Sequence, residues 1–370
     1  MELLTTKAIH GPEEMRYLEE EFYKKKFYFS FSSLGRLLWN PYTFYKEYVL
    51  RQKEPKTDKH LIEGKVIHAL LLSIQHFDKQ FLIMPTRKIP GENTKLVVDH
   101  IFEKYCHCVR EAASMGTASD VLSDYRADII AKLQEMNLHQ SLVDDKPGKS
   151  AGALKTGDDK RMEKILTPDA LEYWEFLLKK GNKDIIDQPT RNFCDKAVEK
   201  VRSIPYVMEL LGIRIEEFAN IEVLNETPMN YDLQNYTFGL QGIIDNLVID
   251  HDNRVIRIND VKTTSKDLKD FQESIEFYSY WAQAVIYVLL VARKYQHLIS
   301  GQNGSPKYKI EFRFIVIDRN HNVYPFPVSQ ETMSTWRERF NKECLFKANY
   351  HYTQRQYSLP YEFAEALVVL

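Results

Sequence analysis

Residues 239–250, GLQGIIDNLVID, and residues 254–264, RVIRINDVKTT, decide the fold of this chain. Apolar residues fill both runs, and the turn-forming His251-Asp252-Asn253 separates them. This pattern predicts an antiparallel β-hairpin. Asp245, Asp260 and Lys262 interrupt the apolar runs. The hairpin therefore carries three charges at buried or half-buried positions, and charges in such places require a reason.

The length of the hairpin loop decides how the two aspartates meet. A two-residue turn at Asp252-Asn253 places Asp245 directly opposite Asp260, and a four-residue loop makes them diagonal neighbours on one face. A three-residue loop would put them on opposite faces. In the first two cases the carboxylates lie within about 5–8 Å and can share one hard cation. Lys262 follows Asp260 by two residues, so its ammonium is expected beside both carboxylates.

Two carboxylates and one lysine suit the hydrolysis of a phosphodiester. A divalent metal would polarise the phosphoryl oxygen and activate a water, while the lysine would stabilise negative charge or orient the nucleophile. A structural ion pair near a sheet edge is the alternative, because short charge patterns are common. Asp245 and the flanking apolar strands favour the metal site.

These motifs resemble a known family. Gly-Ile-Ile-Asp, then Asp-Val-Lys-Thr-Thr, then Tyr280-x-x-Gln283-x-x-x-Tyr287 are similar to the PD-(D/E)XK nuclease superfamily, and in particular to the exonuclease VIII type of phages and prophages. The last three side chains share one helical face. In the family this helix packs beside the metal site. The resemblance implies that Gln283 and Tyr287 position the site and face DNA or water.

The resemblance extends to two further segments. Residues 63–72, EGKVIHALLL, are similar to the family's Gly-x-x-x-His-x-Leu-Leu helix, which implies that His68 reaches the metal. A histidine that only packs in the core is the alternative. The family also has a glutamate in the strand before the hairpin. Glu222 is our first choice and Glu226 the second, since alternation places both on one face; an edge carboxylate without a catalytic role is the alternative.

The resemblance implies an α/β, restriction-endonuclease-like fold: a mixed central sheet flanked by helices, with a helical insertion. We expect residues 1–85 as the N-terminal helical part of the core, 86–200 as the insertion, and 201–370 as the core with the catalytic hairpin. Asp245, Asp260, Glu222, His68 and the Val261 carbonyl would bind Mg²⁺ or Mn²⁺, and Lys262 would assist the attacking water.

The implied function is an exonuclease that degrades linear duplex DNA, 5'-to-3', for phage-type recombination or repair. An endonuclease or defence nuclease of the same fold, or a noncatalytic DNA-binding module, are the alternatives. A single-strand annealing protein is the partner that this role suggests, and ring-forming relatives leave a homo-oligomer open.

Composition sets further bounds. With 370 residues, 44% hydrophobic and 12% aromatic, the chain can bury a large core. The charged first thirty residues and the absence of a long apolar run predict neither a signal peptide nor a membrane span, so we expect a cytoplasmic protein. A net charge of −2 gives no overall nucleic-acid signature. Contact with DNA would thus depend on basic residues gathered locally.

Overall fold

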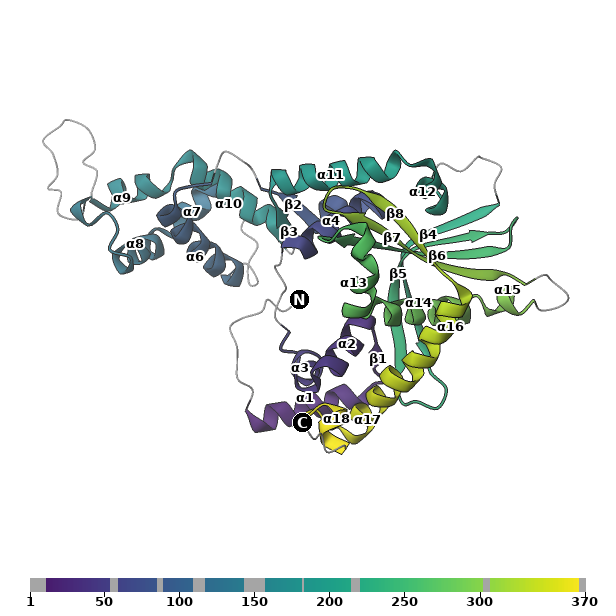
Figure 1. Cartoon of the computed structure of the whole chain (residues 1–370). Coiled ribbons are helices and arrows are strands. Elements are labelled where there is room, and N and C mark those ends of the chain that lie inside the picture. The colour runs from purple at the N-terminus through teal and green to yellow at the C-terminus, as the bar shows by residue number, and fades with distance from the viewer. Residues whose placement is uncertain are drawn as a thin grey trace, which may run out of the picture. The chain divides into compact units, whose positions relative to one another are not determined.

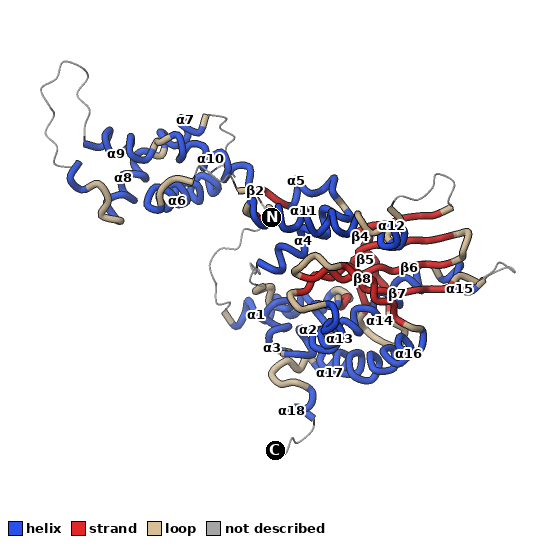
Figure 2. The backbone as a smooth tube through the Cα atoms, turned by 45° about the horizontal axis from the view of Figure 1, so that its top comes forward, coloured by secondary structure: helices blue, strands red, loops and turns tan. Residues whose placement is uncertain are grey.

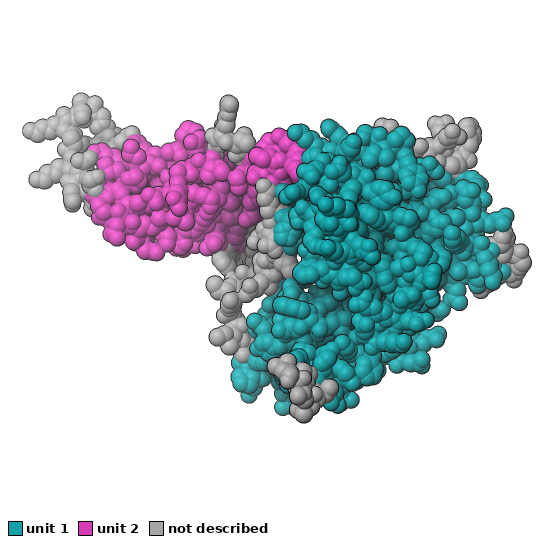
Figure 3. All heavy atoms as spheres, viewed as in Figure 1, with its two compact units in different colours: residues 1–74, 194–370 teal, residues 75–193 magenta. Residues whose placement is uncertain are grey.

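The computed structural model describes residues 11–53, 59–84, 89–108, 117–142, 157–181, 183–213, 220–301 and 307–365. The chain divides into two compact units, one made of residues 1–74 and 194–370 and the other of residues 75–193 (Figure 3). Each unit has a hydrophobic core of its own.

The first unit is built on a six-stranded mixed sheet (Figure 1). Its strands are β1 (Tyr28–Phe29), β4 (Ile221–Asp232), β5 (Gly239–Asp250), β6 (Val255–Thr264), β7 (Lys309–Asp318) and β8 (Val323–Val328). The order is β1-β5-β6-β7-β8, with β4 also paired to β5. β6 and β7 run parallel, as do β1 and β5, while the other pairs are antiparallel. The prediction of a mixed central sheet flanked by helices is confirmed.

Helices cover both faces of this sheet, as Figures 1 and 2 show. Leu247 belongs to the core cluster that contains the buried residues of α14, whereas the neighbouring Asn246 donates a hydrogen bond to the carbonyl of Leu211, just after α12. Adjacent strand residues point to opposite faces, so α14 and α12 lie on opposite sides. The helices are α1 (Pro12–Lys24), α2 (Phe31–Trp39), α3 (Pro41–Phe44), α4 (Lys59–Leu72), α11 (Gln188–Arg202), α12 (Pro205–Leu210), α13 (Phe271–Phe277), α14 (Tyr280–Lys294), α15 (Gln296–Ser300), α16 (Gln330–Arg339), α17 (Phe346–Gln354) and α18 (Tyr361–Glu365); α11 begins in the second unit.

The β5–β6 hairpin has one of the registers expected from the sequence. Asn246 pairs with Asn259, Val248 with Arg257, and Asp250 with Val255. This is the register of a turn centred on Asp252-Asn253, although the regular pairing stops at Asp250 and Val255. Continuing it by one residue in the other direction places Asp245 opposite Asp260.

The second unit is mainly helical. Its core is formed by residues such as Val97, Ile129 and Trp174, which are fully buried. Its elements are α5 (Phe77–Gln80), β2 (Phe81–Ile83), α6 (Glu92–Cys108), α7 (Ala118–Asp124), α8 (Arg126–Glu135), α9 (Gly157–Ile165), α10 (Pro168–Lys180) and β3 (Asp184–Ile186), and β2 pairs in parallel with β3.

One further property concerns the apolar α14. Among the described residues no single helix has the length and apolar composition to cross a membrane. The required length and apolar composition are met only by two helical segments taken together, residues 268–277 and 280–294, and these are bent by 77° relative to each other. Within the fold, α14 buries ten of its residues in the core of the first unit, as an internal helix of a globular domain does.

Candidate metal centre and active site

Three carboxylates occupy one row across β4, β5 and β6. Asn225 pairs with Asn246 and Thr227 with Ile244, so the register places Glu226 opposite Asp245. The β5–β6 register in turn places Asp245 opposite Asp260. The regular pairing is interrupted at this row: the Asp245 carboxylate accepts a hydrogen bond from the Val261 N–H at 2.9 Å. A side chain thus takes the place of a main-chain partner where β5 and β6 diverge.

The alternation of inward and outward residues breaks at the same row. On β5 the core cluster contains Leu240 and Ile244, then Leu247 and Ile249, so the spacing changes from even to odd between Ile244 and Leu247. On β4 the backbone of Glu226 has φ 47°, in the left-handed region that few non-glycine residues adopt. The register stays the same on both sides, so the chain turns its side chains over without inserting a residue.

This reversal corrects the choice between the two glutamates. Glu222 pairs with Ile249, four residues from the carboxylate row, and is exposed. Its charge acts on Tyr295, near the far end of α14. Four residues of strand span about 13 Å. The structure therefore brings Glu226 into the cluster and not Glu222, because the alternation that made them equivalent stops at Glu226.

His68 reaches the row from α4. Its Nε2 lies 2.9 Å from the Val261 carbonyl oxygen. Gly64, one turn earlier, allows this approach, since a Cβ at that position would lie 3.1 Å from Thr263 Oγ1. The carbonyl is an acceptor only, so Nε2 carries the hydrogen and donates it. Nδ1 is then the nitrogen left to accept a proton or a metal.

His68 Nδ1 faces two of the carboxylates. It lies 3.7 Å from Glu226 Oε1 and 3.8 Å from Asp245 Oδ2. Burial acts to lower the pKa of His68, but Asp245 and Glu226 outweigh it and raise that pKa to about 9. One ligand atom from each of the three residues lies within 4.8 Å of the others. One imidazole nitrogen and two carboxylate oxygens suit Mn²⁺ or Mg²⁺, so the donor set fits a divalent cation.

Asp260 and Lys262 form the second half of the site. The Asp260 side chain is fully buried, and Lys262 Nζ lies 2.5 Å from its Oδ2. Burial raises the pKa of Asp260 to about 6. Burial acts to lower the pKa of Lys262, but Asp260 and Asp245 raise it above its ordinary value. At neutral pH both groups are therefore charged. Among the described residues, Asp260 Oδ1 has no hydrogen-bond partner, so it is open to a cation.

Gln283 and Tyr287 lie on α14 beside this row. Gln283 Nε2 donates a hydrogen bond to the Tyr287 hydroxyl at 2.9 Å, and both side chains are buried. Burial, with Asp245 and Asp260, raises the pKa of Tyr287 well above its ordinary value. Gly242 gives the ring its space: a Cβ there would meet Tyr287 Cε1 at 3.0 Å. Both residues support the site from within the core.

The Val261 backbone lies between two of the candidate ligands. Its carbonyl oxygen, which we expect as a metal ligand, lies within hydrogen-bonding distance of His68 Nε2, and its N–H donates to Asp245. The second lone pair of that oxygen is left for a cation. Val261 thus connects two of the cluster's ligands through its backbone.

A row of asparagines next to the carboxylates had not been foreseen. Asn259 Nδ2 donates to Asn246 Oδ1 at 2.6 Å, and Asn246 Nδ2 donates to Asn225 Oδ1 at 2.7 Å. Asn225 also donates to the carbonyl of Leu72, at the end of α4. Asn246 and Asn259 are fully buried. The sequence signal was an asparagine in each strand next to the carboxylate of the row: Asn225 beside Glu226, Asn246 beside Asp245 and Asn259 beside Asp260.

Comparison with known proteins identifies the family. The sequence model of the PD-(D/E)XK nuclease superfamily matches residues 153–358, more than half of the chain. The chain belongs to the PD-(D/E)XK nuclease superfamily. That range contains Glu226, Asp245, Asp260 and Lys262 but not His68, so the place of His68 in this nuclease site rests on the structure. No curated protein matches the chain.

Among solved structures, one similar fold is the crystal structure of the "Putative exonuclease" from Eubacterium rectale. The likeness covers 99% of this chain and 95% of that one, at 10% identity and a TM-score of 0.41.

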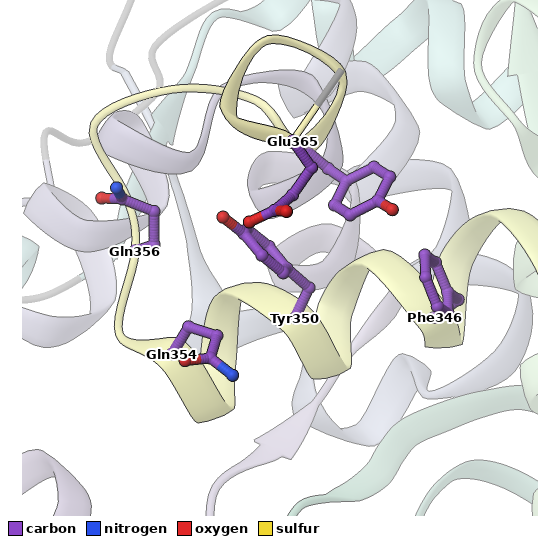
Figure 4. Close-up of a pocket in the computed structure, with 6 residues that line it drawn as sticks. Phe346, Tyr350, Gln354, Gln356 and Glu365 are labelled. Atoms are coloured by element: carbon purple, nitrogen blue, oxygen red, sulfur yellow. The ribbon is translucent and has the colours of Figure 1, made fainter.

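An open hollow of about 640 Å³ lies elsewhere in the nuclease unit (Figure 4). It is lined by α17, α18 and the segment between them, with Phe346, Tyr350 and Glu365 among its residues. None of the residues of the metal cluster lines it. The candidate nuclease site is instead a row of charged side chains at the point where β5 and β6 diverge.

Proposed function

We propose that this protein is a metal-dependent exonuclease that hydrolyses the phosphodiester bonds of linear DNA. The observation that carries the proposal is one row of side chains: the His68–Glu226–Asp245 cluster next to the pair of the buried Asp260 and the half-buried Lys262. A cluster of ligands alone would serve a structural ion. A lysine held beside it supplies the fixed positive charge that phosphoryl transfer requires.

The residues have distinct parts in this proposal. His68 Nδ1, Glu226 and Asp245 hold the cation, and Asp260 Oδ1, which has no hydrogen-bond partner among the described residues, is a further candidate ligand. A bound divalent cation polarises the phosphoryl oxygen and lowers the pKa of a bound water. Lys262 orients that water or stabilises the charge that develops on the phosphate. Val261 fixes both His68 and Asp245, and Gln283 and Tyr287 close the core side of the site.

Mg²⁺ is the cation we propose, with Mn²⁺ as an active substitute. Oxygen donors predominate in the cluster, which suits both ions, and the one imidazole nitrogen favours Mn²⁺ further. An ion that prefers sulfur is disfavoured, since none of the three ligands is a cysteine.

The exonuclease assignment rests on the order of the motifs. The histidine helix, the strand glutamate, the Asp-x-Lys hairpin and the Gln-x-x-x-Tyr helix follow one another as in the exonuclease VIII type. With this assignment we propose 5'-to-3' degradation of duplex DNA in the cytoplasm, in a phage-type recombination or repair system. A single-strand annealing protein and further copies of the chain are proposed partners.

The first experiment compares end-labelled linear duplex and closed circular DNA in Mg²⁺ and in Mn²⁺. The wild-type chain should degrade the linear DNA and leave the circle intact, and the label released first gives the polarity. Lys262→Ala should abolish degradation. Lys309→Ala is the matched control, because Lys309 also pairs with a strand carboxylate two residues away, Glu311, but is exposed.

Each outcome has a clear meaning. Cleavage of the circle would replace the exonuclease with an endonuclease on the same site. If neither linear nor circular DNA is cut in Mg²⁺ or in Mn²⁺, the catalytic proposal is overturned and a DNA-binding module is favoured. Equal loss of activity in Lys262→Ala and Lys309→Ala would show that Lys262 has no special part in the reaction.

A further inference from the structure

The corner between α13 and α14 presents two aromatic rings to solvent. Phe277 is 76% exposed, the largest fraction among the exposed large hydrophobic residues of the described part, and Tyr278 is 53% exposed. The two rings lie 4.8 Å apart at 88° and form an edge-to-face pair. Two adjacent aromatic rings that stay exposed do not gain the free energy that burial would give them. Such a pair is therefore expected to contact another molecule.

A strained backbone fixes the direction of these rings. The helices meet at a bend of 77°, and Ser279 at the corner has φ 56° and ψ 35°. This left-handed conformation is unfavourable for a serine. Two hydrogen bonds hold it, from Tyr278 N–H to the Ser274 carbonyl and from Ser279 N–H to the Glu276 carbonyl. The corner is therefore held by its own backbone, and the rings are presented in a defined direction.

A stack of rings connects this corner to the carboxylate row. The Tyr278 and Tyr280 rings are stacked, with centroids 5.4 Å apart and planes 26° apart. Lys262 Nζ lies 5.1 Å from the centroid of the Tyr280 ring. The same ammonium lies 2.5 Å from Asp260. Two short steps thus lead from an exposed ring to the lysine that we place at the scissile phosphate.

We propose that Phe277 and Tyr278 form a stacking platform for the unpaired nucleobases of the DNA strand that is cut. The proposal rests on the proposed function and adds the form of its substrate: a strand with unstacked bases near the scissile phosphate. Proteins that bind single-stranded nucleic acid stack its bases on aromatic side chains, while a base within a duplex has both faces covered by its neighbours. The continuity of the rings with Lys262 favours a nucleobase over a protein partner.

The test separates base stacking from backbone binding. The substrates are a single-stranded oligonucleotide and the same strand with a tract of abasic nucleotides, and kcat/KM is measured on both in Mg²⁺. The wild type should cut the normal strand about tenfold better. Phe277→Ala/Tyr278→Ala should lose this preference while its rate on the abasic strand stays unchanged. Phe277→Tyr/Tyr278→Phe, which keeps both rings, should behave as wild type.

A control variant and the contrary outcomes complete the test. Tyr17→Ala removes a tyrosine that is 60% exposed on α1, outside the stack, and should keep the preference for normal bases. A wild-type ratio near one, or a loss in the double alanine variant that is equal on both strands, would overturn the platform and leave the nuclease intact. A wild type that cuts neither these strands nor duplex DNA would overturn the proposed function and the platform together.

Discussion

Glu226 shows how one strained residue shapes the site. Its left-handed backbone costs on the order of 1–2 kcal/mol in a residue with a Cβ. In return its carboxylate points toward His68 Nδ1, across from Asp245. In a regular strand the Glu226 carboxylate would point to the opposite face of the sheet, away from His68. The strain is thus stored where the ligands converge, which is typical of functional sites.

The two glutamates of β4 give a matched prediction. Glu226→Gln removes one anionic ligand and should lower Mn²⁺ affinity and the cleavage rate by at least about 100-fold, more than the loss of an outer hydrogen bond would. Glu222→Gln should leave both close to wild type, because Glu222 lies four residues away and is exposed. Titration calorimetry with Mn²⁺ and a gel assay on linear DNA measure the two effects. The opposite order of effects would restore Glu222 as the ligand.

The sequence predicted which of the candidate side chains lie together, except where the local geometry is irregular; their catalytic and metal-binding roles stay predictions. Asp245, Asp260 and Lys262 could be placed because the hairpin keeps a period of two and its turn sets the register. His68 was predicted from the resemblance of its helix to the family's Gly-x-x-x-His-x-Leu-Leu motif. The choice of Glu222 failed because it assumed the same period along β4, and no residue type at Glu226 announces a left-handed backbone. The divergence of β5 and β6 depends on tertiary packing, so it could not be predicted from the sequence either.

At the scale of the elements, the asparagine row connects three strands to two helices. Asn246 and Asn259 donate to the carbonyls of Leu211 and Leu210, at the end of α12, and Asn225 donates to Leu72, at the end of α4. The last turn of a helix leaves carbonyls without partners, and these amides satisfy them. His68 lies one turn before Leu72 on α4. The hydrogen bond from Asn225 to Leu72 therefore also fixes the position of His68 relative to the strands.

Removal of the central amide should therefore destabilise the nuclease unit. Asn246→Ala removes the partner of the buried Leu211 carbonyl and of the buried Asn259 amide, and should lower the free energy of unfolding by about 2–4 kcal/mol. Urea denaturation monitored by circular dichroism measures it. Asn341→Ala, at an exposed position, is the control and should change stability by less than about 0.5 kcal/mol. Equal stability of the two variants would show that the row contributes nothing.

The turn of the β5–β6 hairpin has its own pH dependence. Burial acts to raise the pKa of Asp250, but hydrogen bonds from Asn253 and the charge of Arg257 hold it below its ordinary value. A lowered folded-state pKa means that the carboxylate stabilises the fold above its unfolded pKa of about 3.9, and that this stability is lost as pH falls through the folded value. Asp250→Asn should cost about 1–3 kcal/mol at pH 7.

The measurement is urea unfolding of wild type and Asp250→Asn at several values between pH 7 and pH 3. The difference in free energy between the two proteins should narrow as the pH falls, since the wild type loses its carboxylate interactions and the variant has none to lose. A constant difference over this range would mean that Asp250 contributes through its shape rather than its charge.

At the scale of the molecule, the three proposed metal ligands all belong to one of the two compact units. His68, from the first part of the chain, and Glu226 and Asp245, from the last part, are brought together by the first unit, while residues 75–193 form a core of their own. A helical insertion at residues 86–200 was expected from the family resemblance. Its separate core could not be foreseen, because apolar spacing predicts helices and leaves open which of them pack together.

This division predicts where a bound cation acts. A ligand that binds only the folded state stabilises it by about 2.7 kcal/mol at a concentration 100 times its Kd. For a unit of this size that free energy raises the Tm by roughly 5–10 °C. Because the ligands lie in the first unit, we expect scanning calorimetry of the full chain to show two transitions, of which Mn²⁺ shifts one.

Variants assign the two transitions. Asp245→Asn removes a ligand and should abolish the shift by Mn²⁺, while leaving the other transition at its wild-type temperature. Trp174→Ala opens a cavity in the core of the second unit and should lower the free energy of unfolding of that unit by about 3–5 kcal/mol. Only the transition that Mn²⁺ leaves unchanged should then move to a lower temperature. A single transition that both substitutions and the metal move together would mean that the two units unfold as one cooperative body, with the cation stabilising the whole chain.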